Sequence, residues 1–100
     1  IGMTETQAAA SGRPYEVKRL QTVAIPKAKV LGETHGLLKA IVDKETGLIL
    51  GATLFCPEAH ELINLLKLAM DHQVPASALH TQIFTHPTIA EALNDLFAPN

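Results

Sequence analysis

Hydrophobic and polar positions follow a strand pattern in the first half of the chain and a helical pattern in the second. Residues 15–24 place bulky side chains among polar ones, which predicts a strand. Residues 1–12 predict a short helix before it. Thr4 and Gln7 have the spacing of a capping box, alanines follow, and Gly12 ends the run.

The clearest local pattern is a β-hairpin in the middle of the chain. Residues 26–36 show no periodicity and are expected to form a loop, whereas residues 37–42 and 48–56 are two aliphatic runs around the polar turn DKETG. Gly47 ends that turn and suits a positive φ. Both runs are apolar almost throughout, so we expect both faces of the sheet to be covered. Gly51 interrupts the second run and predicts close approach of another part of the chain.

A long amphipathic helix is predicted over residues 57–73, with Pro57 in its first turn. Its apolar stripe is formed by Leu62, Leu65, Leu66 and Ala69. Ile63 and Met70 widen the stripe beyond what one sheet face requires, which implies a second surface.

The C-terminal segment predicts a last helix over residues 88–97, with Leu93, Leu96 and Phe97 facing inward. The order is helix, strands and then helices. It favours an α+β fold in which helices pack against an antiparallel β-sheet, formed as a single domain over residues 1–100.

Composition limits the classes of partner. The chain is 47% hydrophobic and only 18% charged, below the roughly 25% charged share of an ordinary globular domain. A domain of this size can bury only a limited hydrophobic core of its own, so the additional aliphatic residues favour burial in an oligomer interface. The net charge of −2 and the 4% aromatic content argue against nucleic acid as a partner. No apolar run reaches the roughly 20 residues of a membrane-spanning helix.

The thiol and imidazole groups give no metal or dithiol signature. Cys56 is the only cysteine, which excludes a disulfide within the chain and fits a reducing cytoplasm. It is interpreted as a small core residue, since no base is placed beside it. Five histidines occur, but none has zinc-ligand spacing, and His60 and His72 lie too far apart on one helix to share an ion. We predict no metal site.

The segment HPTIAE, which contains His86 and Glu91, has two interpretations. Pro87 and Thr88 fit the start of a helix, and Thr88 with Glu91 has capping-box spacing. Alternatively, Glu91 holds one imidazole nitrogen of His86 and makes the other a proton acceptor near neutral pH. The second interpretation requires His86 to lie before the helix in an extended conformation, which a following proline favours.

The order of these motifs resembles the C-terminal dimerisation domain of the pyridine nucleotide–disulfide oxidoreductases, the flavoenzymes that include glutathione reductase, dihydrolipoamide dehydrogenase and mercuric reductase. IGMTETQA is similar to the family's VGLTE-x-x-A segment, and HPTIAE matches its HPTxxE motif. The hairpin and the helix after it resemble the segment between these motifs. The FTHPT and EALNDLF ending is closer to the mercuric-reductase-like or reactive-chlorine-responsive bacterial branch than to glutathione reductases.

This resemblance implies a role for each element of HPTIAE. His86 would be the acid–base group for the redox-active cysteines of the partner subunit, Glu91 would orient it, and the backbone of His86 and Pro87 would lie near the partner's flavin. The parent would be a cytoplasmic homodimer that uses FAD and NAD(P)H to act on a disulfide-type or other small redox substrate.

The chain departs from the whole family pattern because it lacks a G-x-G-x-x-G fingerprint and a cysteine pair. We therefore expect a fragment of a longer flavoenzyme, inactive alone and without a bound cofactor. The alternative is a non-catalytic homodimerisation module in which the HPT segment only caps a helix.

Overall fold

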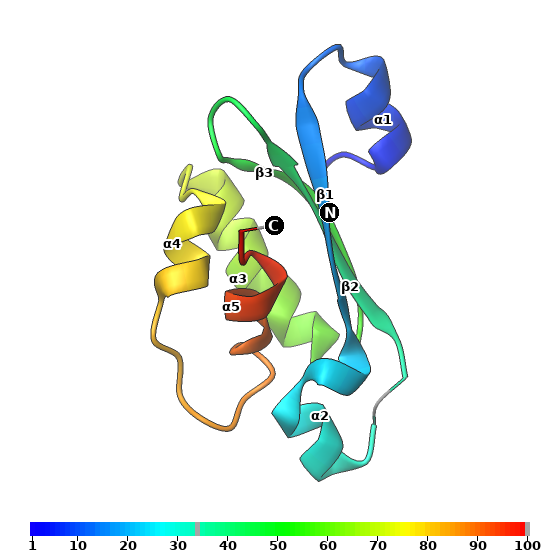
Figure 1. Cartoon of the computed structure of the whole chain (residues 1–100), viewed down its shortest axis with the longest axis vertical. Coiled ribbons are helices and arrows are strands. Elements are labelled where there is room, and N and C mark those ends of the chain that lie inside the picture. The colour runs from blue at the N-terminus through cyan, green and yellow to red at the C-terminus, as the bar shows by residue number, and fades with distance from the viewer. Residues whose placement is uncertain (34, 100) are drawn as a thin grey trace.

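The structure, a computed structural model, describes residues 1–33 and 35–99 and confirms the predicted α+β fold. Three antiparallel strands in the order β1-β2-β3 form one sheet, and the helices of the C-terminal half pack on one of its faces (Figure 1). The strands are β1 (Tyr15–Gln21), β2 (Leu37–Asp43) and β3 (Ile49–Phe55). The helices are α1 (Glu5–Ala10), α2 (Pro26–Leu31), α3 (Ala59–Asp71), α4 (Ala76–Thr81) and α5 (Ala92–Leu96), and a 3₁₀ turn spans Thr22–Ala24.

One apolar core lies between the sheet and the helices α3, α4 and α5. The residues that are almost completely buried come from all of these layers and include Leu38, Leu66, Ile89, Leu93 and Leu96. The predicted inward positions of α5 are therefore confirmed. Because Ile89 and Leu93 lie on either side of Glu91 in the sequence, burial of these two side chains fixes the stretch of chain that carries this carboxylate.

The N-terminal capping box and the hairpin form as predicted. The Thr4 hydroxyl accepts from the Gln7 N–H while the Gln7 side chain accepts from the Thr4 N–H. In the hairpin turn, Gly47 has a φ of +74°. The buried Asp43 carboxylate accepts the Glu45 N–H at 2.8 Å, so local hydrogen bonds as well as the glycine fix this turn.

Gly51 is a point of close approach, also as predicted. The N-terminal segment runs antiparallel alongside β3 there, where Gly2 and Gly51 form an isolated bridge. The Met3 N–H donates to the Leu50 carbonyl at 2.9 Å. A β-carbon on Gly51 would overlap the Met3 carbonyl oxygen, so only glycine permits this pairing.

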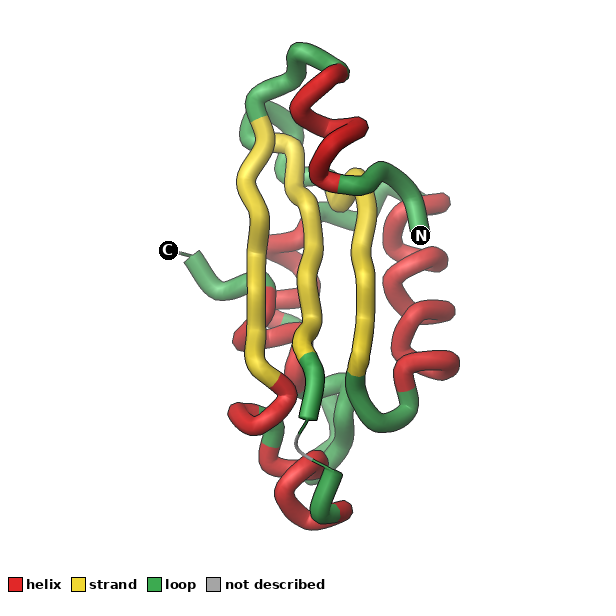
Figure 2. The backbone as a smooth tube through the Cα atoms, turned by 90° about the vertical axis from the view of Figure 1, so that its right-hand side faces the viewer, coloured by secondary structure: helices red, strands yellow, loops and turns green. Residues whose placement is uncertain are grey.

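The second face of the sheet is covered only in part, unlike our expectation. Figure 2 shows the N-terminal segment and α1 lying over one end of this face, with the rest of it free of helices. Ile41, on this face, is 3% exposed, whereas the Phe55 ring at the other end is 68% exposed. The apolar runs of the hairpin therefore contain more hydrophobic surface than this chain covers.

Residues 26–36 were predicted as a loop, which is wrong for the stretch that forms α2. Its start and stop signals are present, because Pro26 lies in the first turn and Gly32 takes the left-handed conformation after the last. The helix nevertheless has no apolar stripe, since Val30 is 70% exposed and Ala28 is its one buried residue. The spacing of hydrophobic residues in this stretch therefore does not indicate a helix.

Two other helix starts were predicted too early. The long helix begins at Ala59, and Pro57 precedes it. The last helix begins at Ala92 instead of residue 88. Over residues 89–94 each hydrogen bond runs from an N–H to the carbonyl three residues earlier, as from Ala92 to Ile89, which is a tighter turn than that of an α-helix. Pro87 is therefore not a first helical residue. In addition, β1 ends at Gln21 instead of continuing to residue 24.

Within residues 1–33 and 35–99, no helix has the length and apolar character needed to cross a bilayer.

Candidate active site

His86 and Glu91 meet in the segment that joins α4 to α5. The His86 Nδ1 atom lies 2.8 Å from Oε1 and 2.9 Å from Oε2 of the Glu91 carboxylate. The peptide bond between His86 and Pro87 is cis. The structure thus brings together the two residues that the sequence paired, and it does so with His86 outside the helix.

Glu91 is fixed by more than the imidazole. Its side chain is 20% exposed, against 70% for that of His86, and its Oε2 also accepts the Thr88 N–H at 3.1 Å. The Thr88 hydroxyl donates instead to the Thr85 carbonyl at 2.7 Å. Only one half of the predicted capping box therefore forms, and the carboxylate serves the loop that carries His86 instead of a helix start.

This arrangement assigns the tautomer of His86. A carboxylate accepts hydrogen bonds, so the proton of the neutral imidazole is placed on Nδ1. The other nitrogen, Nε2, then carries a lone pair, and no hydrogen bond joins it to the described residues. An exposed imidazole with this tautomer accepts a proton at Nε2, and the adjacent carboxylate stabilises the resulting cation.

The pair borders a small open hollow of about 190 Å³. Its lining residues are Pro26, His86, Glu91, Ala92, Asn94 and Asp95. This hollow is small compared with the 300–1,000 Å³ typical of a small-molecule site. The described chain alone therefore provides a hydrogen-bonded His–Glu pair at its surface but not an enclosed site for a substrate.

Two polar residues near the pair were not singled out from the sequence. The Asn94 side-chain amide donates to the backbone carbonyls of Leu79, His80 and Gln82 at 2.8–3.0 Å. In return, His80 Nδ1 donates to the Asn94 carbonyl at 2.7 Å. A polar Asn inside a short helix, where its intrinsic propensity is low, is a weak sequence signal of such a contact.

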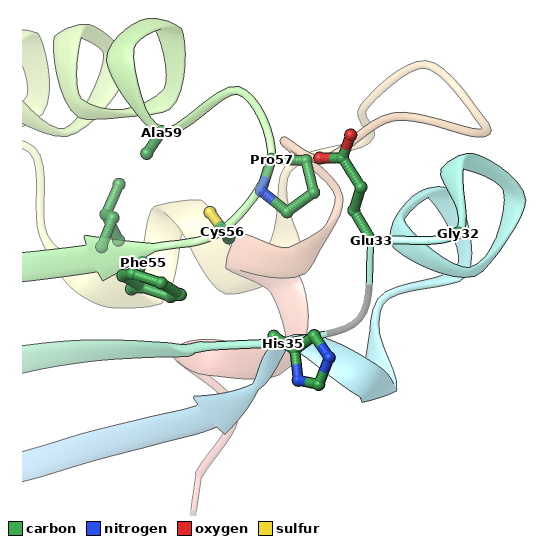
Figure 3. A pocket seen from close by; sticks show the side chains of 8 residues that line it. Gly32, Glu33, His35, Phe55, Cys56, Pro57 and Ala59 are labelled. Carbon is green, nitrogen blue, oxygen red and sulfur yellow. The ribbon is translucent and has the colours of Figure 1, made fainter.

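Cys56 lies in a separate, larger hollow of about 450 Å³, which shares no lining residue with that of His86 (Figure 3). His35, Phe55 and Pro57 are among its lining residues. Burial raises the pKa of the Cys56 thiol, and the Glu58 carboxylate raises it further. The thiol is therefore held in its protonated form, which suits the predicted structural role better than that of a nucleophile.

Among the residues that the structure describes, no three His, Cys, Asp or Glu side chains gather closely enough to hold a metal ion. His60 and His72 lie near opposite ends of α3.

Comparison with known proteins decides what kind of domain carries this pair. Residues 1–97 match the family model described as "Pyridine nucleotide-disulphide oxidoreductase, dimerisation domain". The chain belongs to this family. Because the match spans nearly the whole chain, this pyridine nucleotide–disulfide oxidoreductase dimerisation domain includes both the hairpin and the His86 segment, and the resemblance drawn from the motifs is confirmed.

Among curated relatives, the domain is 52% identical over 98 residues to the probable pyridine nucleotide-disulfide oxidoreductase RclA of Escherichia coli. It is 39% identical over 95 residues to a dihydrolipoyl dehydrogenase of Rhizobium etli. These alignments cover 98% and 95% of this chain but only 22% and 20% of the two relatives. The chain thus spans about one fifth of the length of the curated relatives it matches.

Solved structures show the same fold. The HOCl-induced flavoprotein disulfide reductase RclA from Escherichia coli superposes with a TM-score of 0.94 at 53% identity, over 96% of this chain and 22% of that one. LpdA from Mycobacterium tuberculosis superposes with a TM-score of 0.87 at 20% identity, over 97% and 21%. RclA is described as a disulfide reductase, whereas the LpdA match shows the fold alone, and this dimerisation domain corresponds to about one fifth of each protein.

Proposed function

We propose that this chain is one domain of a longer FAD- and NAD(P)H-dependent oxidoreductase, in which it joins two subunits and supplies His86 to the active site of the partner. The observation that carries the proposal is the carboxylate-held imidazole of His86 on the surface of a dimerisation domain. Within residues 1–100 the one thiol, that of Cys56, lies in a different hollow, so the pair serves no thiol of this domain.

An exposed apolar side chain beside His86 supports burial of this region against a second copy. Ile83 lies three residues before His86 and is 91% exposed. A large aliphatic side chain left in water loses the stabilisation that burial provides, about 1.5–3 kcal/mol. Contact with a partner subunit at Ile83 recovers that stabilisation and brings protein next to the exposed imidazole of His86.

In the proposed mechanism, His86 moves one proton. Its Nε2 atom takes the proton from a thiol of the partner's cysteine pair, which leaves a thiolate to attack the disulfide-type substrate. Glu91 stabilises the imidazolium through Nδ1. When the substrate sulfur leaves, the imidazolium returns the proton to it, so the histidine ends the step neutral and ready for another cycle.

The flavin and nicotinamide would bind in the parts of the parent that this chain does not span. The exposed segment at His86 and Pro87 fits a position beside a partner's flavin, because it lies at the surface, outside helix and strand. When bound, these cofactors supply the electrons that reduce the cysteine pair. We place the parent in the cytoplasm, where a free thiol such as that of Cys56 stays reduced.

The alternative of a non-catalytic module depended on the HPT segment capping a helix. The N-cap of α5 is Glu91, and it makes no side-chain capping bond. A pure interaction role for the segment therefore has less support than the sequence alone gave it.

The experiment is a pH–rate profile of the intact enzyme with His86→Gln, which removes the titrating group and keeps a polar side chain. We expect turnover of the disulfide-type substrate to fall by about 10²-fold or more, with loss of one acid–base inflection from the pH–rate profile. Flavin content and flavin reduction by NAD(P)H should be unchanged. A variant with the wild-type rate and profile would reject the assignment.

A further inference from the structure

Asn94 joins the two helices on either side of the His86 segment. It lies in α5, and its side-chain amide donates to the carbonyls of Leu79, His80 and Gln82 at 2.9, 3.0 and 2.8 Å. The first two carbonyls belong to the last turn of α4, where helix geometry leaves carbonyls without partners. Asn94 therefore caps the C-terminal end of α4 from a neighbouring helix, with two amide hydrogens shared among three acceptors.

A second contact makes this connection reciprocal. His80, in the last turn of α4, donates from Nδ1 to the backbone carbonyl of Asn94 at 2.7 Å. Each residue thus binds the other's backbone, and the pair fixes α4 and α5 together at the point where the His86 segment leaves α4. Leu79 and Leu93, the neighbours of His80 and Asn94 in the sequence, are buried, so the contact is anchored in the core on both sides.

Asn94 and Glu91 hold the two ends of the segment that carries His86. The bond to Gln82 holds the start of the segment, and Glu91, one turn before Asn94, holds His86 near its end. Between them, Phe84 packs in part against the core and the Thr85 carbonyl accepts from the Thr88 hydroxyl, whereas the Ile83 side chain is 91% exposed. The placement of His86 relative to Glu91 thus depends on the two fixed ends of this segment together with the Phe84 contact.

We propose that Asn94 is a positioning residue for His86, acting through the α4 carbonyls and Gln82 to keep the imidazole aligned with Glu91 and directed at the partner's thiol. This inference rests on the function proposed for His86. Asn94→Ala removes all three side-chain bonds at once. A displacement of the acid–base group follows, and outer positioning contacts of this kind typically change rates by about 10- to 100-fold.

The test uses the intact flavoenzyme and compares Asn94→Ala and Asn94→Asp with Asn64→Ala. The aspartate keeps the shape of asparagine but faces the three carbonyls with acceptors alone, so it separates the hydrogen bonds from side-chain volume. Asn64 is a matched control, because its amide donates to the His60 carbonyl at 3.2 Å on the exposed surface of α3. Flavin reduction by NAD(P)H, which does not use His86, reports whether each variant is folded.

We expect both Asn94 variants to lower kcat for the disulfide-type substrate by about tenfold or more and to change the pH dependence of kcat. Asn64→Ala should have no effect. The decisive comparison adds Asn94→Ala to the His86→Gln enzyme, where it should cause no further loss, since its effect passes through His86.

An equal additional loss in the His86→Gln background would show a general structural effect and overturn the inference. Wild-type kcat in both Asn94 variants, with His86→Gln still slow, would overturn the inference alone. An enzyme in which His86→Gln itself retains full activity would overturn the proposed function, and this inference with it.

Discussion

The Glu91 carboxylate gives the most informative single substitution at the candidate site, because Glu91→Gln keeps its size and removes its charge. In the structure the two carboxylate oxygens receive the His86 Nδ1 proton at 2.8 and 2.9 Å, and one of them also receives the Thr88 N–H at 3.1 Å. A glutamine offers one carbonyl oxygen and one NH₂ group in their place. Two donors then compete for a single acceptor, and the imidazolium loses its counter-charge.

The size of the effect follows from the type of bond that is lost. Hydrogen bonds to charged groups contribute about 1.5–3 kcal/mol. The Glu91 side chain is 20% exposed but that of His86 is 70% exposed, so water screens the pair and the lower end of this range applies. With a stabilisation of the imidazolium of about 1.5 kcal/mol in the transition state, loss of the carboxylate slows the proton-transfer step about 10-fold.

Stopped-flow measurement of the disulfide half-reaction in the intact enzyme isolates that step from hydride transfer. The matched control is Glu45→Gln, since Glu45 is an exposed acid in the hairpin turn, far along the chain from the site. Glu91→Gln should be slow in the disulfide half-reaction and normal in flavin reduction by NAD(P)H. A change smaller than about twofold, or an equal loss in the Glu45 control, would refute the argument that Glu91 orients and stabilises the His86 imidazole.

Two further predictions concern the fold. Gly51→Ala should lower the free energy of unfolding by about 1–3 kcal/mol, because its methyl group displaces Met3 and breaks the bonds that hold the N-terminal segment; denaturant unfolding measures this, and an unchanged midpoint contradicts it. The Lys39 ammonium, 2.7 Å from Glu5, donates to its carboxylate and lowers the Glu5 pKa. A lowered folded-state pKa stabilises the protein above the ordinary value of 4.5, and this stabilisation is lost as acidification protonates the carboxyl. Glu5→Gln should therefore lower the Tm at neutral pH but not in strong acid, and a Tm difference that persists in acid would contradict this.

The parts of the fold that were predictable are those fixed by contacts between near neighbours in the sequence. The Thr4 capping box and the turn at Gly47 depend on residues three or four positions apart, and both form. The α2 helix was missed although its start and stop signals are local. Val30 and Leu31 are exposed, so the hydrophobic pattern that identifies a helix is absent.

The two residues of the candidate site could be predicted from the sequence, but the contacts that hold them in place could not. The spacing of His86 and Glu91 raised the possibility of a pair, while the interpretation of the same residues as a helix start placed the first residue of α5 four positions too early. What holds the segment, the Asn94 amide on the carbonyls of α4, joins residues 12 to 15 positions apart. Such contacts depend on how two helices pack, and no pattern in a single sequence specifies them.

The central claim is that His86 serves cysteines on the other subunit, and a mixed dimer tests it most directly. One subunit of the intact enzyme carries His86→Ala and keeps its cysteine pair; the other keeps His86 and has both redox cysteines replaced by serine. With different affinity tags, the heterodimer can be purified and its disulfide reductase activity compared with both inactive homodimers. Our account predicts about half the wild-type activity, because one of the two symmetric sites combines an intact cysteine pair with an intact partner histidine. A heterodimer as inactive as its parents would contradict the account, since it would place His86 and the cysteines that it serves on the same chain.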